Sequence, residues 1–210
     1  MSTLTTLRAA LRQDLHDEDG SAYRWTDAVL NRHLQRALEE LQNAWPLDAE
    51  ASIPAVAGQL HYALGSLTGL LWVERVWYPY DVALPAVWAP FREAGGSLYL
   101  QTDDPPAGTE TIRVFYAKAH TVDASGSTVL AEHEHVLVAG VAAHALADLA
   151  VKATGQVNLS RFTARDLSAI YDRRRAEFDA QLQRLRNQRL ARASHPVTWT
   201  FADSTGRLVI

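Results

Sequence analysis

The sequence predicts an α+β protein: an antiparallel four-helix core, an antiparallel β module inserted between helices two and three, and an extended C-terminal arm. Two observations predict this class. Apolar residues recur every three or four positions near both ends of the chain, whereas short β-prone runs separated by Pro, Gly and Asp fill the middle. The expected units are a helical domain (residues 1–46 and 129–193), a β domain (47–128) and an arm (194–210).

Composition is that of a folded globular protein. The 210 residues are 48% hydrophobic and 21% charged, and there is no cysteine, which excludes disulfides and thiolate chemistry. The N-terminus lacks the basic start and apolar run of a secretory signal, so we expect synthesis and folding in the cytoplasm. The longest apolar stretch, Val136–Ala147, is shorter than the ~20 residues of a membrane span, and we expect no membrane partner.

The first two helices are predicted over about Thr3–His16 and from Thr26 to the residue before Pro46. Thr26 is placed to cap the second helix. Trp25 and Leu30 are placed to form a hydrophobic staple around that cap. We expect the two helices to form a hairpin with one shared apolar seam. The solvent side of the first helix is expected to carry Arg8, Arg12 and Asp14.

The middle of the chain has the period of two that is typical of strands. We predict strands at Ala51–Val56, Leu60–Leu64, Leu70–Tyr78, Ala86–Phe91, Ser97–Gln101 and Thr111–Lys118. Seven aromatic residues lie in or beside these strands: Trp72, Trp77, Tyr78, Trp88, Tyr99, Phe115 and Tyr116. A small sheet needs large side chains in its core, so we interpret them as packing residues; a platform for sugars or bases is the alternative.

The last two helices differ in character. The third, about Ala131–Thr154, is apolar and rich in small residues, so it should be buried and closely approached by its neighbours. The fourth, about Thr163–Ala193, is about 45 Å long at 1.5 Å per residue. One compact partner cannot cover such a helix, and we expect part of it to meet another subunit or an external protein.

Charge is distributed unevenly. Residues 1–160 carry ten basic and nineteen acidic residues, a net charge of −9, whereas residues 161–192 carry nine arginines against four carboxylates, a net charge of +5. A basic helix is typical of nucleic-acid binding, which makes a DNA- or RNA-binding module one interpretation. The other is a solvated or subunit-contacting face, in which arginines pair with the acidic body of neighbouring copies.

No pattern predicts catalysis. Neither Gly65–Gly69 nor Gly95-Gly96 has the spacing of a phosphate-binding loop, and no Gly-x-Ser-x-Gly motif occurs. In Glu132–His135, ligands two apart on a helix point about 200° apart and cannot close on one ion. His144 is interpreted as a buried or interface histidine. We therefore expect no enzyme, no cofactor and no metal.

Several segments, taken in order, resemble a known family. They are Leu7–Leu15, Trp25–Asp27 leading into Leu30 and Ala37–Leu41, Gly58–Leu64, Gly96–Leu100 and Ile112–Tyr116, followed by the Ala-rich third and the charged fourth helix. Over roughly residues 4–192 the chain resembles the head–tail connector adaptors of tailed bacteriophages, which include gatekeepers and tail tubular protein A-like proteins. Its β insertion is similar to that of the larger adaptors of short-tailed phages; whether the tail is short or long stays open.

The resemblance implies a virion protein of the neck, present in the host cytoplasm during assembly. It implies a ring, commonly of twelve copies, below the portal protein, which extends the DNA channel and attaches a tail or nozzle protein. Genomic dsDNA would pass without sequence-specific binding. The helices would build the ring, the β module would face outward or tailward, and helix four with the arm would reach the portal. The expected portal or inter-subunit contacts are Arg173, Arg174, Arg175, Arg184, Arg186, Arg189, Trp199 and Phe201.

Overall fold

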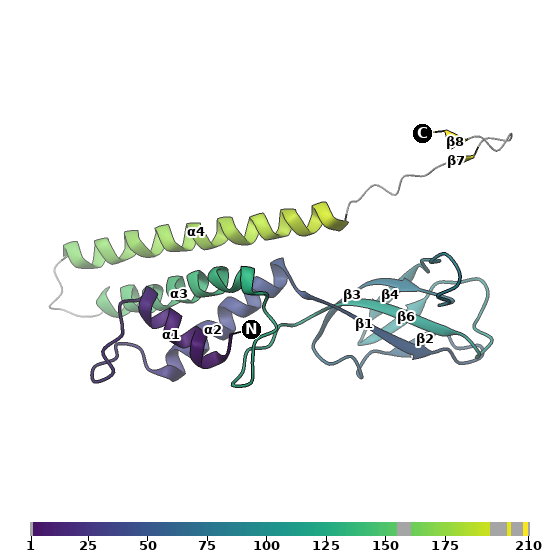
Figure 1. The fold of residues 1–210 in the computed structure, drawn as a ribbon, viewed down its shortest axis with the longest axis horizontal. Coiled ribbons are helices and arrows are strands. Elements are labelled where there is room, and N and C mark those ends of the chain that lie inside the picture. Colours follow the sequence, from purple (N-terminus) through teal and green to yellow (C-terminus); the bar gives the residue numbers. More distant parts are fainter. Residues whose placement is uncertain (1, 155–160, 194–200, 203–207, 210) are drawn as a thin grey trace.

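The computed structural model describes residues 2–154, 161–193, 201–202 and 208–209 and confirms the α+β class. The helices are α1 (Leu4–Asp14), α2 (Asp27–Ala44), the 3₁₀ helix η1 (Ala131–His133), α3 (Glu134–Thr154) and α4 (Arg161–Ala193). The strands are β1 (Leu47–Pro54), β2 (His61–Ala63), β3 (Leu70–Trp77), β4 (Phe91–Ala94), β5 (Ser97–Leu100), β6 (Thr111–Lys118), β7 (Phe201–Ala202) and β8 (Leu208–Val209). Figure 1 shows helices α1–α4 at one end of an elongated molecule and strands β1–β6 at the other.

The predicted helix starts are confirmed in detail. The Thr3 side chain accepts a hydrogen bond from the Thr6 backbone N–H and completes a capping box, and Thr26 accepts from the Val29 N–H. Trp25 and Leu30 are both buried in one apolar cluster, as the staple requires. These local signals fix where α1 and α2 begin.

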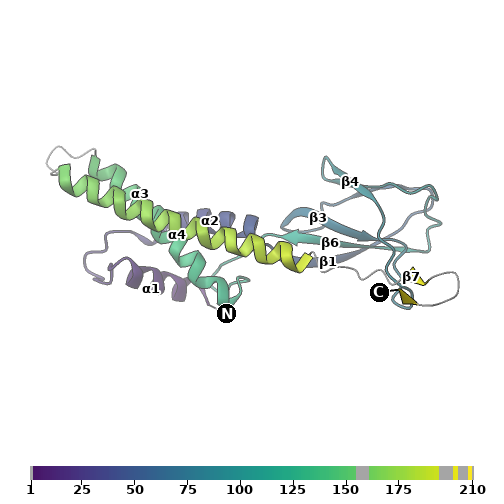
Figure 2. The same ribbon diagram turned by 90° about the horizontal axis from the view of Figure 1, so that it is seen from above.

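Helix α3 is the central helix of the helical part. It packs against α1, α2 and α4, and it lies between α1 and α4 (Figures 1 and 2). The predicted α1/α2 hairpin is therefore wrong in its packing, because α1 lies chiefly on α3 instead of along α2. One buried cluster draws on all four helices: Leu7, Leu11, Leu34, Ala37, Leu38, Leu41, Ala44, Trp45, Val136, Leu137, Val141, Phe178, Leu182 and Leu185, with Val122 and Val129 from the segment before α3.

The β module consists of two three-stranded antiparallel sheets. Their strand orders are β1-β6-β3 and β2-β5-β4. Alternate side chains of both sheets meet in one buried cluster, to which the first sheet contributes Val73, Val76, Ile112, Val114 and Tyr116 and the second Tyr62, Leu98 and Leu100. The inserted β module thus has a core of its own, separate from that of the helices.

One predicted strand is misplaced. The chain forms β4 at Phe91–Ala94 instead of a strand over Ala86–Phe91, and within the predicted run Trp88 makes a single bridge to Trp77. Pro85 precedes this run and Pro90 lies within it; both lack the N–H that a ladder needs, which explains why regular pairing begins only after them. Strand β1 also begins earlier than predicted, at Leu47.

Near the C-terminus, β7 and β8 pair antiparallel, consistent with the β-prone character expected of this segment. Trp199 and most of the predicted arm lie outside the described residues.

By length and composition, one of the described helical segments could cross a membrane: Ala131–Lys152, with a mean hydropathy of 1.4. It is longer than the apolar stretch noted in the sequence. This segment is formed by η1 and α3, and 44% of its apolar window is buried. Helices α1, α2 and α4 pack against α3, and Leu137, Val141, Ala143 and Ala145 are fully buried among them.

Candidate functional site

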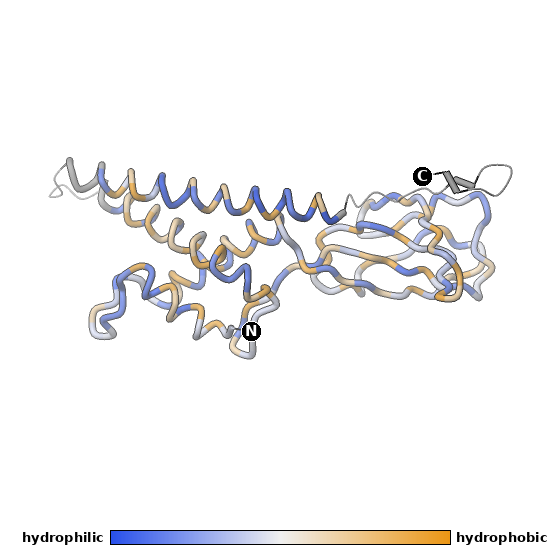
Figure 3. Tube along the Cα trace, turned by 45° about the horizontal axis from the view of Figure 1, so that its top comes forward, coloured by the Kyte–Doolittle hydropathy of each residue, from blue (hydrophilic) through white to orange (hydrophobic). Residues whose placement is uncertain are grey.

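Helix α4 has one packed side and one open side. Phe178, Leu182 and Leu185 are buried against the other helices, whereas Ile170 and Leu190 are 49% and 67% exposed. The hydropathy colouring in Figure 3 shows the contrast between this largely hydrophilic helix and the apolar α3 beneath it. Apolar residues left exposed on a long, largely hydrophilic helix are a feature expected of a subunit interface.

The packed side depends on a close approach to α3. A Cβ at Gly140 would lie 2.6 Å from Phe178 Cζ and 3.1 Å from Ala37 Cβ, closer than carbon atoms normally come. The Phe178 ring therefore occupies the space that the missing side chain leaves. This confirms the prediction that small residues make α3 thin enough for close packing.

A partly buried carboxylate, that of Glu40, contacts side chains of two other helices at this seam. The Glu40 carboxylate of α2 forms an ion pair with the Arg175 guanidinium of α4. Arg175 Nη2 lies 2.8 Å from Glu40 Oε2, and Nη1 donates a hydrogen bond to Oε1 at 3.2 Å. His144 Nε2 of α3 lies 3.0 Å from Glu40 Oε1, and Arg175 also bonds Asp179. Arg175 is thus a structural partner of the helical part as well as a predicted interface residue.

The charges of this seam shift the pKa values of its members. Burial disfavours the charged form of Glu40, but the hydrogen bonds and charge of Arg175 outweigh it and lower the pKa of that carboxyl. Burial also lowers the pKa of His144, and the same cause lowers that of His33, whose ring stacks on His144 with centroids 6.3 Å apart. Both imidazoles are therefore neutral at pH 7.

The C-terminal end of α4 connects the helical part to the β module. Arg189 Nη2 lies 2.8 Å from Asp48 Oδ1 of β1 and also pairs with Glu74 of β3. One turn later, the Arg192 guanidinium lies 4.7 Å from the centre of the Trp45 ring, at the end of α2. Only two residues separate the end of α2 from the start of β1. The Arg192–Trp45 contact therefore covers the connection between the helical part and the β module.

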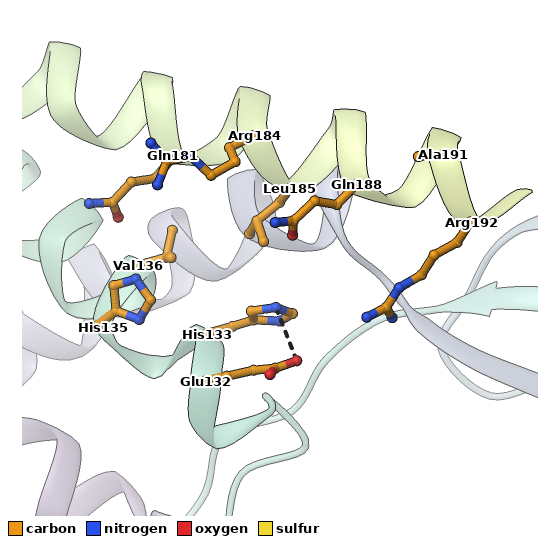
Figure 4. A pocket seen from close by; sticks show the side chains of 10 residues that line it. All are labelled: Glu132, His133, His135, Val136, Gln181, Arg184, Leu185, Gln188, Ala191 and Arg192. Atoms are coloured by element: carbon orange, nitrogen blue, oxygen red, sulfur yellow. Dashed lines mark ion pairs between the residues drawn. The ribbon is translucent and has the colours of Figure 1, made fainter.

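A groove of about 550 Å³ lies between the start of α3 and the second half of α4 (Figure 4). In Figure 4, Glu132, His133 and His135 lie on the α3 side, and Leu185, Gln188 and Arg192 reach toward them from α4. The remaining lining residues are Val136, Gln181, Arg184 and Ala191. His133 is buried edge-on against Trp45, with ring centroids 4.9 Å apart.

A second groove of about 510 Å³ lies between α1 and α3 and also includes His135. Arg174 of α4 lines it, and its Nη2 lies 3.4 Å from Asp14 Oδ1. At its end, both oxygens of Glu134 accept hydrogen bonds from Ser2, at 3.1 Å from the backbone nitrogen and 2.7 Å from Oγ. The Glu132–His135 run is thus divided among different partners instead of converging on one point.

Among the residues that the structure describes, no group of three or more His, Asp or Glu side chains is arranged to hold a metal ion. The two grooves are open and hold scattered amides, imidazoles and guanidinium groups. Their geometry suits contact with another protein surface better than enclosure of a small molecule.

The predicted site residues divide into two sets. Arg173, whose side chain is 82% exposed, lies 3.4 Å from Glu177 in the next turn, and Arg184 and Arg186 are exposed. Arg174, Arg175 and Arg189 are held in the ion pairs described above. Of the two aromatic residues, Phe201 begins β7 with its side chain outside the description, and Trp199 lies outside the described residues.

Sequence reasoning misplaced one residue of α1. Arg12 was expected in solvent, but it is 8% exposed: its Nη1 lies 2.9 Å from Asp17 Oδ2 and its Nη2 2.7 Å from Asp27 Oδ1. The guanidinium also lies 3.5 Å from the centre of the Tyr23 ring. These ion pairs and the contact with Tyr23 hold the loop between α1 and α2 in place. The acidic run after α1 was a usable signal, since a buried arginine needs carboxylate partners.

Comparison with known proteins identifies the family. The family model described as SU10 adaptor protein matches residues 2–200, nearly the whole chain. No curated protein matches this chain. The match spans helices α1–α4 and strands β1–β6 and ends just before β7, and it agrees with the resemblance to phage adaptors. The chain belongs to the SU10 adaptor protein family.

Proposed function

We propose that this phage adaptor forms a ring below the portal vertex, extends the DNA channel and provides the attachment surface for a tail or nozzle protein. The observation that carries the proposal is the family match over residues 2–200. The open side of α4 supports it, because Ile170 and Leu190 stay uncovered in a single copy. A ring, proposed to contain twelve copies, would supply the missing cover.

The units proposed for this assembly are a helical domain of four antiparallel helices (residues 1–46 and 129–193), a β domain (47–128) and an arm (194–210). The separate buried clusters of the helices and of the two sheets support this division. The helical domain is the ring-forming unit because it carries the uncovered face of α4. The arm, with Trp199 and Phe201 as apolar anchors, is proposed to reach the portal.

The exposed arginines of α4 are proposed to pair with carboxylates of a neighbouring copy or of the portal. Arg173, Arg184 and Arg186 project into solvent, whereas the body of the chain is strongly acidic, so head-to-tail contacts bring opposite charges together. The paired arginines, Arg175 and Arg189, would act by holding α4 in place.

The genome is proposed to pass through the ring without being gripped. A channel wall with ordered phosphate-binding arginines would slow a sliding duplex. Arg174, Arg175 and Arg189 already engage carboxylates of the same chain, which weakens the alternative of a nucleic-acid-binding module built on α4.

A charge-reversal variant tests the interface. Replacing Arg173, Arg184 and Arg186 by Glu should leave the fold intact and abolish ring formation on the purified cognate portal, as seen by electron microscopy. The matched control is Arg92→Glu, an exposed arginine of the β module. Rings that form normally with the triple variant would refute the α4 interface. If wild-type protein instead binds free DNA as a monomer in a salt-dependent way that the variant loses, the nucleic-acid module is correct.

Removal of the arm tests the portal contact. Deletion of residues 194–210 should leave a folded protein that no longer joins portal-bearing, DNA-filled heads. Unchanged joining would show that the arm is not the docking element.

A further inference from the structure

Three loops of the β module meet at its end farthest from the helices: residues 55–60, 78–90 and 101–110 (Figures 1 and 2). Hydrogen bonds tie them together or to the adjoining strand. Gly58 N donates to Pro106 O at 2.8 Å, Gln101 N to Pro90 O at 2.9 Å, and Tyr80 N to Thr111 O at 2.9 Å. We call these three loops the distal tip.

The distal tip exposes an unusual amount of apolar surface. Residues 82–90 contain no charged side chain. Within them Val82 is 80%, Leu84 61%, Val87 57% and Trp88 47% exposed, and Val56 of the neighbouring loop is 50% exposed. Exposed apolar side chains gathered in one region of a protein surface are typical of a contact surface. We call these five residues the apolar patch.

This patch is held in place by the sheet beneath it. Tyr78 N donates to Val87 O at 3.1 Å, and Ala89 N donates to Val76 O at 2.9 Å, so the loop closes like a hairpin on the end of β3. The Trp88 ring packs on Phe115 with centroids 5.8 Å apart, and the Arg75 guanidinium lies 4.7 Å from its centre. Such anchoring lowers the entropy that a partner must remove on binding.

Within the three loops the charges are of one sign; the guanidinium groups of Arg75 and Arg113, from the adjoining strands, lie over the rings of Trp88 and Tyr80. The three loops contain Asp81, Asp103, Asp104 and Glu110 and no Lys, Arg or His. A partner that covers the apolar patch must therefore tolerate or neutralise carboxylates at its rim. Electrostatic complementarity requires basic side chains around an apolar hollow.

We infer that the distal tip is the docking surface for a tail-side virion protein that presents an apolar hollow rimmed by Lys and Arg. This inference rests on the proposed function, because it takes the copies to stand side by side in a ring. In that arrangement the tips of identical copies carry like charges and repel each other, and each tip is remote from the basic α4 of its neighbour. The tip therefore binds a different protein. A bacterial membrane is a poorer partner, since its anionic lipids repel the same carboxylates.

The test uses full-length adaptor assembled on the purified cognate portal, with the purified cognate tail proteins as the probe. The variant Val82→Ser/Leu84→Ser/Val87→Ser removes the apolar contacts without touching the buried β core. We expect normal rings on the portal and at least tenfold weaker binding of tail protein. The matched control is Trp72→Ser, an exposed aromatic (37%) near the other end of β3, which should bind tail protein normally. A second variant, Asp103→Asn/Asp104→Asn, should reduce the salt dependence of binding.

Failure of the inference and failure of the proposed function give different results. If wild-type adaptor forms no complex with the portal, the proposed function is wrong. If rings form but tail proteins bind the triple variant as well as wild type, or bind neither, the inference is overturned. Binding of wild-type protein to phosphatidylglycerol vesicles that the triple variant loses, or tip-dependent self-association in solution, would also overturn it.

Discussion

Gly140 decides how closely the two longest helices approach. A glycine inside a helix normally costs about 1 kcal/mol relative to alanine, because it loses more backbone freedom on folding. Here the Phe178 ring, fully buried, fills the space above it. The cost in backbone entropy is thus offset by packing that no other residue permits.

Gly140→Ala should therefore destabilise the protein, contrary to the usual effect in helices. The added methyl group would lie 2.6 Å from Cζ of the fully buried Phe178 ring, so we expect a loss of about 1–3 kcal/mol in the free energy of unfolding. Urea denaturation measures it. Phe178→Leu in the same chain should recover part of the loss, whereas Gly65→Ala, where a Cβ meets nothing within 4 Å, should be nearly neutral. Equal stability of Gly140→Ala and wild type would contradict this packing.

Single residues also show where sequence reasoning stops. The cap at Thr26 was predicted and is confirmed, because a cap depends on neighbours within a few positions. The cap at Thr3, which was not predicted, depends on equally close neighbours. The burial of Arg12 and the role of Glu40 were not, because their partners come from other elements: Asp27 for the first, Arg175 and His144 for the second. Candidate interface arginines could be named from the sequence, but their division into exposed and paired sets required the fold.

At the scale of elements, the helical part and the segment that joins β6 to it contain buried, uncharged histidines. Burial lowers the pKa of His33, His144, His120 and His133 below the ordinary value of 6.5. In each case the unfolded chain takes up a proton more readily than the folded one. Stability is therefore full above pH 6.5 and decreases as the pH falls from there through the lowered pKa values.

We thus expect the free energy of unfolding to fall between about pH 6.5 and 5, before the carboxylates titrate. Urea titrations at half-unit pH intervals measure this. The variant His33→Gln/His144→Gln, with neutral side chains in their place, should show a shallower slope over the same interval. A slope that stays unchanged in the variant would mean that these two imidazoles do not carry the dependence.

Arg189 links α4 to the two outer strands of the first sheet. Arg189→Met keeps the aliphatic length but removes the contacts with Asp48 and Glu74, so we expect about 1 kcal/mol lower stability and faster hydrogen exchange at the start of β1. Mass spectrometry of exchanged peptides resolves the site. Arg186→Met, an exposed neighbour on the same helix, is the control. Similar exchange in both variants would exclude a role for Arg189 at this joint.

Elements were easier to predict from the sequence than their packing. Long periodic segments identified all four helices, and strands with unbroken alternation, such as β6, were placed correctly. The strand near Trp88 was misplaced because two prolines flank an apolar run, and the α1/α2 hairpin failed because sequence periodicity does not say which helix covers which face.

At the scale of the whole molecule, the adaptor has two ends with different surfaces. The helical end carries exposed arginines and uncovered apolar residues along α4, and the distal tip is apolar and acidic. Opposite ends with distinct chemistry suit a protein that connects two different partners, and each end can be disabled separately by the variants described above.

The most direct test of this account is an electron-microscopic reconstruction of the adaptor bound to its cognate portal. It should show a closed ring below the portal, with α4 at contacts between neighbouring copies or at the portal and with the distal tips directed away from the portal toward the tail. A portal that binds no adaptor, or a ring in which the open side of α4 faces solvent in every copy, would contradict it.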